Sequence, residues 1–194
     1  MPYSDQKKGT LIAFTAIMFI TPDSLLIRMA NVNSWNLIFY RGFIPFLVVF
    51  AGLLIIYKTK LLKEIINNGW HGFFYAFVFT ITNIVFVISI ENTNVANTLI
   101  MIALAPMLSA ILGALFLKEA PDKKTWLAIF LTFTACVYIF HDSLKLGNIY
   151  GDLLGFATAF GLACNATLAR YAKNRDLVPS AVIGKLCVAI FAFF

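Results

Sequence analysis

The stretch that decides the fold is Asn92–Leu117, NTNVANTLIMIALAPMLSAILGALFL, which carries no charged side chain. A helix needs about 20 apolar residues to cross the core of a bilayer, and this stretch supplies them from Val95 onward. Of the 194 residues in the chain, 61% are apolar and 12% are charged. Soluble domains carry about 25% charged residues, so this chain has too few to cover a water-soluble surface. The composition predicts an all-α polytopic membrane bundle and excludes soluble enzymes, disordered chains and disulfide scaffolds.

Window hydropathy predicts seven spanning helices along the whole chain. They are Gly9–Ile27, Trp35–Tyr57, Trp70–Ile90, Val95–Leu117, Thr125–His141, Ile149–Ala169 and Val178–Phe194. The connectors between them are too small to be separate domains. The last segment is apolar up to its final residue, so we expect the chain to be cut short there.

The positions of lysine and arginine predict the orientation in the membrane. If the segments alternate, eleven basic residues fall on one side and two on the other. The larger set is Lys7, Lys8, Lys58, Lys60, Lys63, Lys118, Lys123, Lys124, Arg170, Lys173 and Arg175, and the smaller set is Arg28 and Lys145. Since basic loops stay in the cytoplasm, we expect a cytoplasmic N-terminus in the plasma or inner membrane. The net charge of +6 then reflects topology, and nucleic acid is not an expected partner.

An internal repeat relates the first segment to the sixth. A shift of 142 positions pairs Gly9 with Gly151, Leu11 with Leu153, Phe14 with Phe156, Leu26 with Leu168, Arg28 with Arg170, and Asp23 with Asn165. The second copy comes five helices after the first, an odd number, so it runs in the opposite direction. Inverted repeats are typical of secondary transporters, with the site near the membrane midplane. We expect residues 1–142 to form a five-helix repeat and residues 143–194 to begin an inverted second repeat that is incomplete.

Four ionisable residues are candidates for a solute or coupling pathway: Asp23, Arg41, Glu91 and Lys185. A charge inside the bilayer costs roughly 2.5–3.5 kcal/mol on insertion scales, so each one needs a reason. Helix rise places Asp23 and Arg41 at the same depth, which allows an ion pair between them. Lys185 occupies the inverted counterpart of the Arg41 position. The two cations are therefore candidates to meet an anionic or zwitterionic solute.

Two uncharged residues complete the candidate pathway. Pro106 lies near the middle of the fourth span, where it is a hinge, a cavity wall or a packing kink. Asn83 lies in the middle of the third span, where an amide either joins helices or binds solute. Pro22, directly before Asp23, favours a break in the first helix. Glu91 opens a polar stretch at the outer mouth, which we expect to be mostly a solvated turn with a helix cap.

Structural roles are the alternative for several of these residues. Arg41 and Lys185 are close enough to the membrane faces to snorkel. Small residues at Gly151 and Gly155, with a second pair at Ser109 and Gly113, provide faces for packing within the bundle or in a homodimer.

No catalytic chemistry is indicated. The sequence has no nucleophile elbow, phosphate loop, HExxH motif or paired catalytic carboxylates, so an enzyme is not expected. The three cysteines, Cys136, Cys164 and Cys187, lack ligand spacing, so neither a metal site nor a disulfide is expected.

Two other classes remain open. A seven-helix photoreceptor would hold retinal on a lysine of the seventh span, although the predicted N-terminal side is opposite to the usual arrangement. A non-transporting scaffold would use its intramembrane charges for folding alone.

Two stretches resemble the EamA-type family of the drug/metabolite transporter superfamily. ALAPMLSAILGALFLKEAP, at 103–121, is similar to the family's fourth helix, and GDLLGFATAF, at 151–160, resembles the start of its second repeat. Arg41 matches the arginine usual in the second helix. The resemblance implies ten helices in two inverted repeats around a cavity that opens to each side in turn. It implies export or uptake of small metabolites such as amino acids, without a bound cofactor. The driving force that we expect is a gradient of protons, of sodium as the coupling ion, or of the substrate itself.

Overall fold

The computed structural model describes residues 9, 11–12, 14–15, 18, 22–30, 32–58, 61–119, 121–145, 149–173 and 175–193. The chain divides into two compact units, Met1–Asn31 and Val32–Phe194. In the first unit, helix α2 covers Asp23–Ala30 and begins directly after Pro22. The Pro22 carbonyl accepts the Leu26 N–H at 3.0 Å, so it closes the first turn of this helix.

The described part of the second unit is helical and contains no strand. Its helices are α3 (Ser34–Tyr57), α4 (Leu61–Asn92), α5 (Val95–Ile102), α6 (Ala105–Phe116), α7 (Lys123–Lys145), α8 (Ile149–Tyr171) and α9 (Val178–Phe193). The expected all-α membrane bundle is therefore confirmed.

Of the seven predicted spans, four are confirmed as helices whose length and composition suit a membrane crossing. Among the described residues, the helices long and apolar enough to cross a membrane are Ser34–Tyr57, Leu61–Asn92, Val95–Phe116 and Ile149–Tyr171. Val178–Phe193 is a shorter apolar helix. Helix α7 covers the fifth predicted segment without being among the four, and part of Gly9–Ile27 lies outside the described residues.

Two helices are interrupted, each for a local reason. Gly69 has φ +48° and ψ −134°, so the backbone of α4 bends there and Leu61–Asn68 forms a separate short helix. A positive φ is a conformation that glycine adopts without a Cβ penalty. The second break, at Ala103 and Leu104, separates α5 from α6 just before Pro106. Because proline lacks an N–H, the Ile102 carbonyl loses its usual helical partner. The sequence left a hinge, a cavity wall or a packing kink open at Pro106, and the structure has a helix break directly before it.

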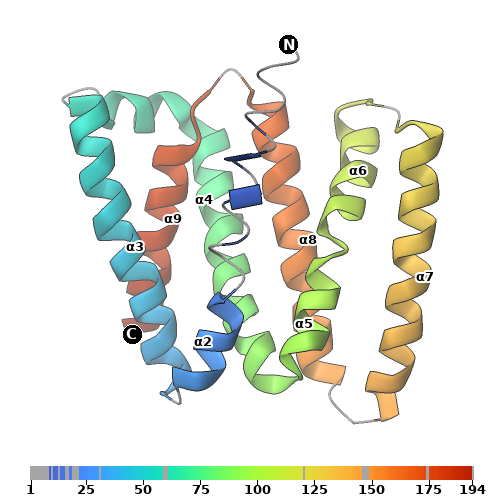
Figure 1. The fold of residues 1–194 in the computed structure, drawn as a ribbon. Coiled ribbons are helices and arrows are strands. Elements are labelled where there is room, and N and C mark those ends of the chain that lie inside the picture. The colour runs from blue at the N-terminus through green and yellow to red at the C-terminus, as the bar shows by residue number, and fades with distance from the viewer. Residues whose placement is uncertain are drawn as a thin grey trace. The chain divides into compact units, whose positions relative to one another are not determined.

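The helices of the second unit pack in two groups around α4 (Figure 1). Helix α9 packs against α3 and α4, while α8 packs against α4, α5 and α6. Helix α7 packs against α5 and α6 at the edge of the unit. Helix α4 therefore contacts helices from both groups.

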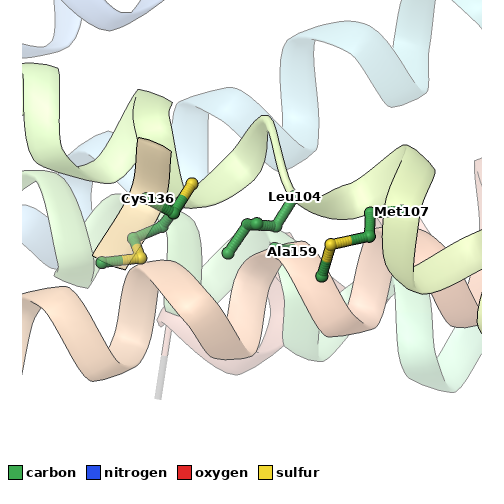
Figure 2. Packing of buried hydrophobic residues seen from close by; sticks show 5 residues of the cluster. Leu104, Met107, Cys136 and Ala159 are labelled. Atoms are coloured by element: carbon green, nitrogen blue, oxygen red, sulfur yellow. The ribbon is translucent and has the colours of Figure 1, made fainter. Parts of the chain in front are cut away.

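Three apolar clusters fill the contacts between these helices. The largest joins α5, α6, α7 and α8 through Met101, Leu104, Met107, Cys136 and Ala159. Figure 2 shows Leu104 and Met107 beside Ala159 of α8 in this cluster. The others consist of Ile38, Ile84, Val87 and Val188, and of Leu53, Leu61 and Val182. The side chains on the outside are also apolar, with Ile66 77% exposed and Ile55 76% exposed. Such a surface requires lipid around it.

Small residues let the helices approach closely inside the bundle. A Cβ on Gly151 would lie 2.5 Å from the Asn92 carbonyl carbon, and one on Gly155 would lie 3.2 Å from Ser89 Oγ. On α6, Gly113 faces the Arg170 side chain. The sequence left open whether these faces pack within the bundle or between protomers. These three glycines pack within the bundle, so they no longer argue for a homodimer.

Most of the described basic residues of the second unit lie near one of its ends. The α3–α4, α6–α7 and α8–α9 connections lie at one end, and the α4–α5 connection lies at the other (Figure 1). In or beside the first three are Lys58, Lys63, Lys118, Lys123, Lys124, Arg170, Lys173 and Arg175. We call this the basic end. The membrane side that it faces stays a prediction.

Candidate functional site

Lys185 and Asn83, both predicted from the sequence, lie together. Lys185 Nζ donates a hydrogen bond to Asn83 Oδ1 at 2.6 Å, and it lies 5.2 Å from the centroid of the Phe79 ring. Asn83 Nδ2 in turn donates to the Phe79 carbonyl at 2.8 Å. The amide is thus fixed by its own helix, with its oxygen directed at the ammonium group of α9.

The Lys185 side chain bonds across to α4 within the span. Its neighbour Gly184 accepts a hydrogen bond from Thr80 Oγ1 at 3.1 Å, which sets the level of α9 against α4. Asn83 lies about one turn further from Gly69 along α4 than Thr80 does. An ammonium that snorkelled would point toward the membrane surface. This one bonds to an amide in the span.

Arg41 contacts the same face of α4. Its guanidinium carbon lies 5.3 Å from the centroid of the Phe86 ring. Phe79, Asn83 and Phe86 are spaced by four and three residues, so they share one helix face. A cation within about 6 Å of an aromatic face is attracted to it, more strongly where water is excluded. The α4 face therefore holds a cation from α3 and another from α9.

Gly42 brings the two cation-bearing helices into contact. A Cβ at this position would lie 2.7 Å from the Lys185 carbonyl oxygen and 2.6 Å from the Ala189 backbone nitrogen. The backbones of α3 and α9 approach this closely because Gly42, which follows Arg41, has no side chain. We call Arg41, Phe79, Asn83, Phe86 and Lys185 the α4 cation site.

Glu91 lies apart from the α4 cation site. It is exposed in the last turn of α4, where Ser34 Oγ donates a hydrogen bond to its Oε2. It is eight residues beyond Asn83, about 12 Å along the helix axis. The expected turn and cap are present, since Asn94 Oδ1 accepts the Ala96 N–H at 3.2 Å.

The polar stretch after Glu91 is less solvated than we expected. Thr93 is 4% exposed and Thr98 is 0% exposed. Thr93 Oγ1 donates to Asp152 Oδ1 at 2.6 Å, and Ser89 Oγ donates to the Gly151 carbonyl at 2.7 Å. These bonds join the α4–α5 turn to the start of α8.

Asp152 is a buried carboxylate that the sequence did not single out. It is 1% exposed in the first turn of α8, where the helix dipole favours a negative charge. Its position at the predicted start of a span is typical of an exposed interfacial residue. No local pattern connects it to Thr93, which is 59 residues away in the sequence.

Two further predicted residues are Pro106 and Asp23. Pro106 is exposed near the start of α6, next to the break between α5 and α6. Asp23 lies in the first unit, in the first turn of α2. The ion pair between Asp23 and Arg41 stays a prediction.

Polar contacts at the basic end join α8 and α9 to the short helix Leu61–Asn68. Arg175 Nη1 donates to the Asn67 carbonyl at 2.6 Å and to the Asn68 carbonyl at 3.2 Å, so a cation caps the C-terminus of that helix. Asn68 Nδ2 donates to the Asp176 carbonyl at 2.6 Å. The sequence did not predict this short helix.

An apolar pocket with a volume of about 780 Å³ lies between α4 and α9. Its lining includes Phe73, Phe77, Ile81 and Ile183, and neither cation of the α4 cation site lines it. Its two hydroxyl-bearing residues, Thr80 and Ser180, already take part in hydrogen bonds. A polar solute is not expected to bind there.

The long apolar helices, the apolar exterior and the charges held inside the bundle define a multi-pass membrane protein. The model of the EamA-like transporter family matches residues 7–141. The chain therefore belongs to this family of membrane transporters, as the sequence resemblance predicted. No curated protein and no solved structure matches the chain.

Proposed function

We propose that the protein is a secondary transporter that moves small polar metabolites, amino-acid-like or related solutes, by alternating access. The α4 cation site is the part of its pathway that meets an anionic group of the solute. One observation carries this proposal. Two cations from different helices, Arg41 and Lys185, lie against the same face of α4 in a member of a transporter family.

The energetics favour a functional role for these charges. Each cation costs roughly 2.5–3.5 kcal/mol to place in the bilayer on insertion scales. A cation–π contact returns about 0.5–2 kcal/mol, so the rings of Phe79 and Phe86 offset part of that cost. A solute carboxylate would gain charge-assisted hydrogen bonds from both cations.

Coupling to a proton or sodium gradient is assigned to the carboxylates. Asp23 follows a proline in the first unit, and Glu91 lies at the end of the bundle opposite the basic end. We place the basic end and the N-terminus in the cytoplasm of a plasma or inner membrane. We also infer that residues from 143 onward begin an inverted second repeat.

Helix interruptions supply the hinges that alternating access requires. Residues that end or interrupt helices absorb large changes of φ and ψ in such motions. Gly69 interrupts α4, and the Ala103–Leu104 break before Pro106 separates α5 from α6. Both interruptions lie in helices that contact α8. We infer that one repeat rocks against the other about these positions.

Metabolite profiling of cells with and without the full-length gene tests the proposal. We expect the level of one or a few small polar solutes to change when the gene is expressed. Arg41→Gln, Lys185→Gln and Asp23→Asn should each abolish that change, because each removes a charge of the pathway. Lys123→Gln is the matched control at the basic end and should behave as the wild type. If no solute level changes, or if the three variants act as the wild type does, the proposal is wrong.

A further inference from the structure

Asn165 is a buried amide in the middle of α8. Its residue is 6% exposed, and neither Oδ1 nor Nδ2 has a hydrogen-bond partner. Among the buried side-chain nitrogen and oxygen atoms of the described residues, these two are the ones without a partner. Buried polar atoms almost always have one, so this amide requires an explanation.

Several other polar side chains donate a hydrogen bond to a carbonyl of their own helix. Thr158 and Thr167, both buried on α8, donate to the carbonyls of Leu154 and Ala163 at 2.9 and 2.8 Å. On α4, Asn92 donates to the carbonyl four residues earlier at 2.7 Å. The Asn165 amide makes no such bond to the carbonyl four residues earlier on its own helix.

Along α8, Asn165 lies between a contact with α4 and a contact with α6. One turn earlier, Gly161 faces Thr82 of α4, and five residues later the Arg170 side chain lies along Gly113 of α6. The amide lies between these two levels. Lipid cannot hydrogen-bond to it, so its partner has to come from within the protein's interior.

The chemistry of an amide limits what the partner is. A carboxamide offers an acceptor oxygen and two N–H donors. A group that both donates and accepts would satisfy it, such as water or a hydroxyl or amide of a polar solute. The sequence repeat pairs Asn165 with Asp23, the carboxylate assigned to coupling in the first repeat.

We propose that Asn165 is the polar ligand of a hydrated, solute-accessible site within the α4, α6 and α8 packing. Water occupies the site in the absence of solute, and a donor–acceptor group of the solute replaces it during transport. The inference rests on the proposed transport function and adds a second polar contact, separate from the α4 cation site. It assigns to the solute a hydroxyl or amide in addition to its anionic group.

Thiol accessibility tests the site without knowledge of the solute. Asn165→Cys is made in full-length protein in which Cys136, Cys164 and Cys187 are replaced by alanine, and membrane vesicles are treated with a charged methanethiosulfonate. We expect modification about tenfold faster than for Ala163→Cys, because the reacting thiolate forms where water is present. Ala163 is 0% exposed on the same helix and is the matched control. Equal rates for the two variants would overturn the proposal.

A second arm separates the two sources of the ligand. A mixture of amino acids added before the reagent should slow modification of Asn165→Cys if a solute group binds there, and unchanged fast modification assigns the site to water. Loss of transport in Lys185→Gln, together with an unreactive Asn165→Cys, would reject this site and leave the proposed function standing.

Discussion

The Lys185 ammonium on α9 donates to the amide oxygen of Asn83 on α4 at 2.6 Å, across two helices separated by 102 residues in sequence. Because the amide is neutral, this bond orients the ammonium without cancelling its charge. The ammonium is partly buried and also lies 5.2 Å from the centroid of the Phe79 ring.

Asn83→Asp should reduce transport of an anionic solute. The new carboxylate would pair with Lys185 and neutralise the charge that the solute meets. We expect a loss of at least about tenfold in the initial rate, the equivalent of about 1.4 kcal/mol. Asn92→Asp is the control, since Asn92 also donates to a carbonyl of α4 but is exposed at its end. Similar rates for the two variants would mean that the charge at Lys185 does not meet solute.

Gly42→Ala should destabilise the protein, because the added Cβ would meet the backbone of α9 at 2.6 and 2.7 Å. Overpacking of this kind costs about 1–3 kcal/mol. Gly52→Ala on the same helix has nothing within 4 Å of its Cβ and should unfold at the wild-type temperature or above. Thermal unfolding in detergent measures both. If Gly42→Ala is as stable as Gly52→Ala, the close contact of α3 with α9 is wrong.

Thr93→Val should also lower stability, because it removes a donor from the buried carboxylate of Asp152. Hydrogen bonds to charged groups contribute about 1.5–3 kcal/mol. Thr132→Val is the matched control, since Thr132 is only partly buried on α7 and donates to the carbonyl of its own helix at 2.8 Å. We expect the melting temperature of Thr93→Val to fall below that of Thr132→Val. Equal melting temperatures would contradict a stabilising contact between α8 and the α4–α5 turn.

Asp122, in the connection before α7, should titrate below its ordinary range. The Thr125 hydroxyl and backbone N–H both donate to Asp122 Oδ1, at 2.5 and 2.8 Å, and these bonds lower the pKa of the carboxyl. Since the folded pKa lies below the unfolded one, the stabilisation is present above the unfolded pKa and is lost as the pH falls through the folded pKa. NMR titration of the side-chain carboxyl measures this directly. Thr125→Ala should raise the titration midpoint of Asp122, because it removes the hydroxyl donor. An unchanged midpoint would contradict the effect of this hydrogen bond on the pKa.

The sequence predicted those parts of the molecule that depend on local hydropathy. The limits of α3 and the break before Pro106 follow from apolar length and from proline chemistry, and both are present. The short helix Leu61–Asn68 was missed because its charges, beside Lys58, resemble those of a connector. It is held by Arg175, whose partner carbonyls lie more than a hundred residues away in sequence.

The candidate site was predicted in part for a similar reason. Arg41 and Lys185 are charged residues in apolar segments, so the free-energy cost of placing a charge in the bilayer identifies them. Their placement on one face of α4 depends on packing that no spacing encodes. The burial of Asp152 has the same origin, since it depends on how the α4–α5 turn meets α8.

Uptake of the solute identified by profiling, into liposomes that contain the purified full-length protein, tests the central claim most directly. The comparison is between the wild type, Lys185→Gln and the charge-preserving Lys185→Arg. We predict that Lys185→Gln loses at least about tenfold of the initial rate, equivalent to about 1.4 kcal/mol, and that Lys185→Arg keeps most of it. Transport by Lys185→Gln at the wild-type rate would contradict the claim that the α4 cation site lies on the solute pathway.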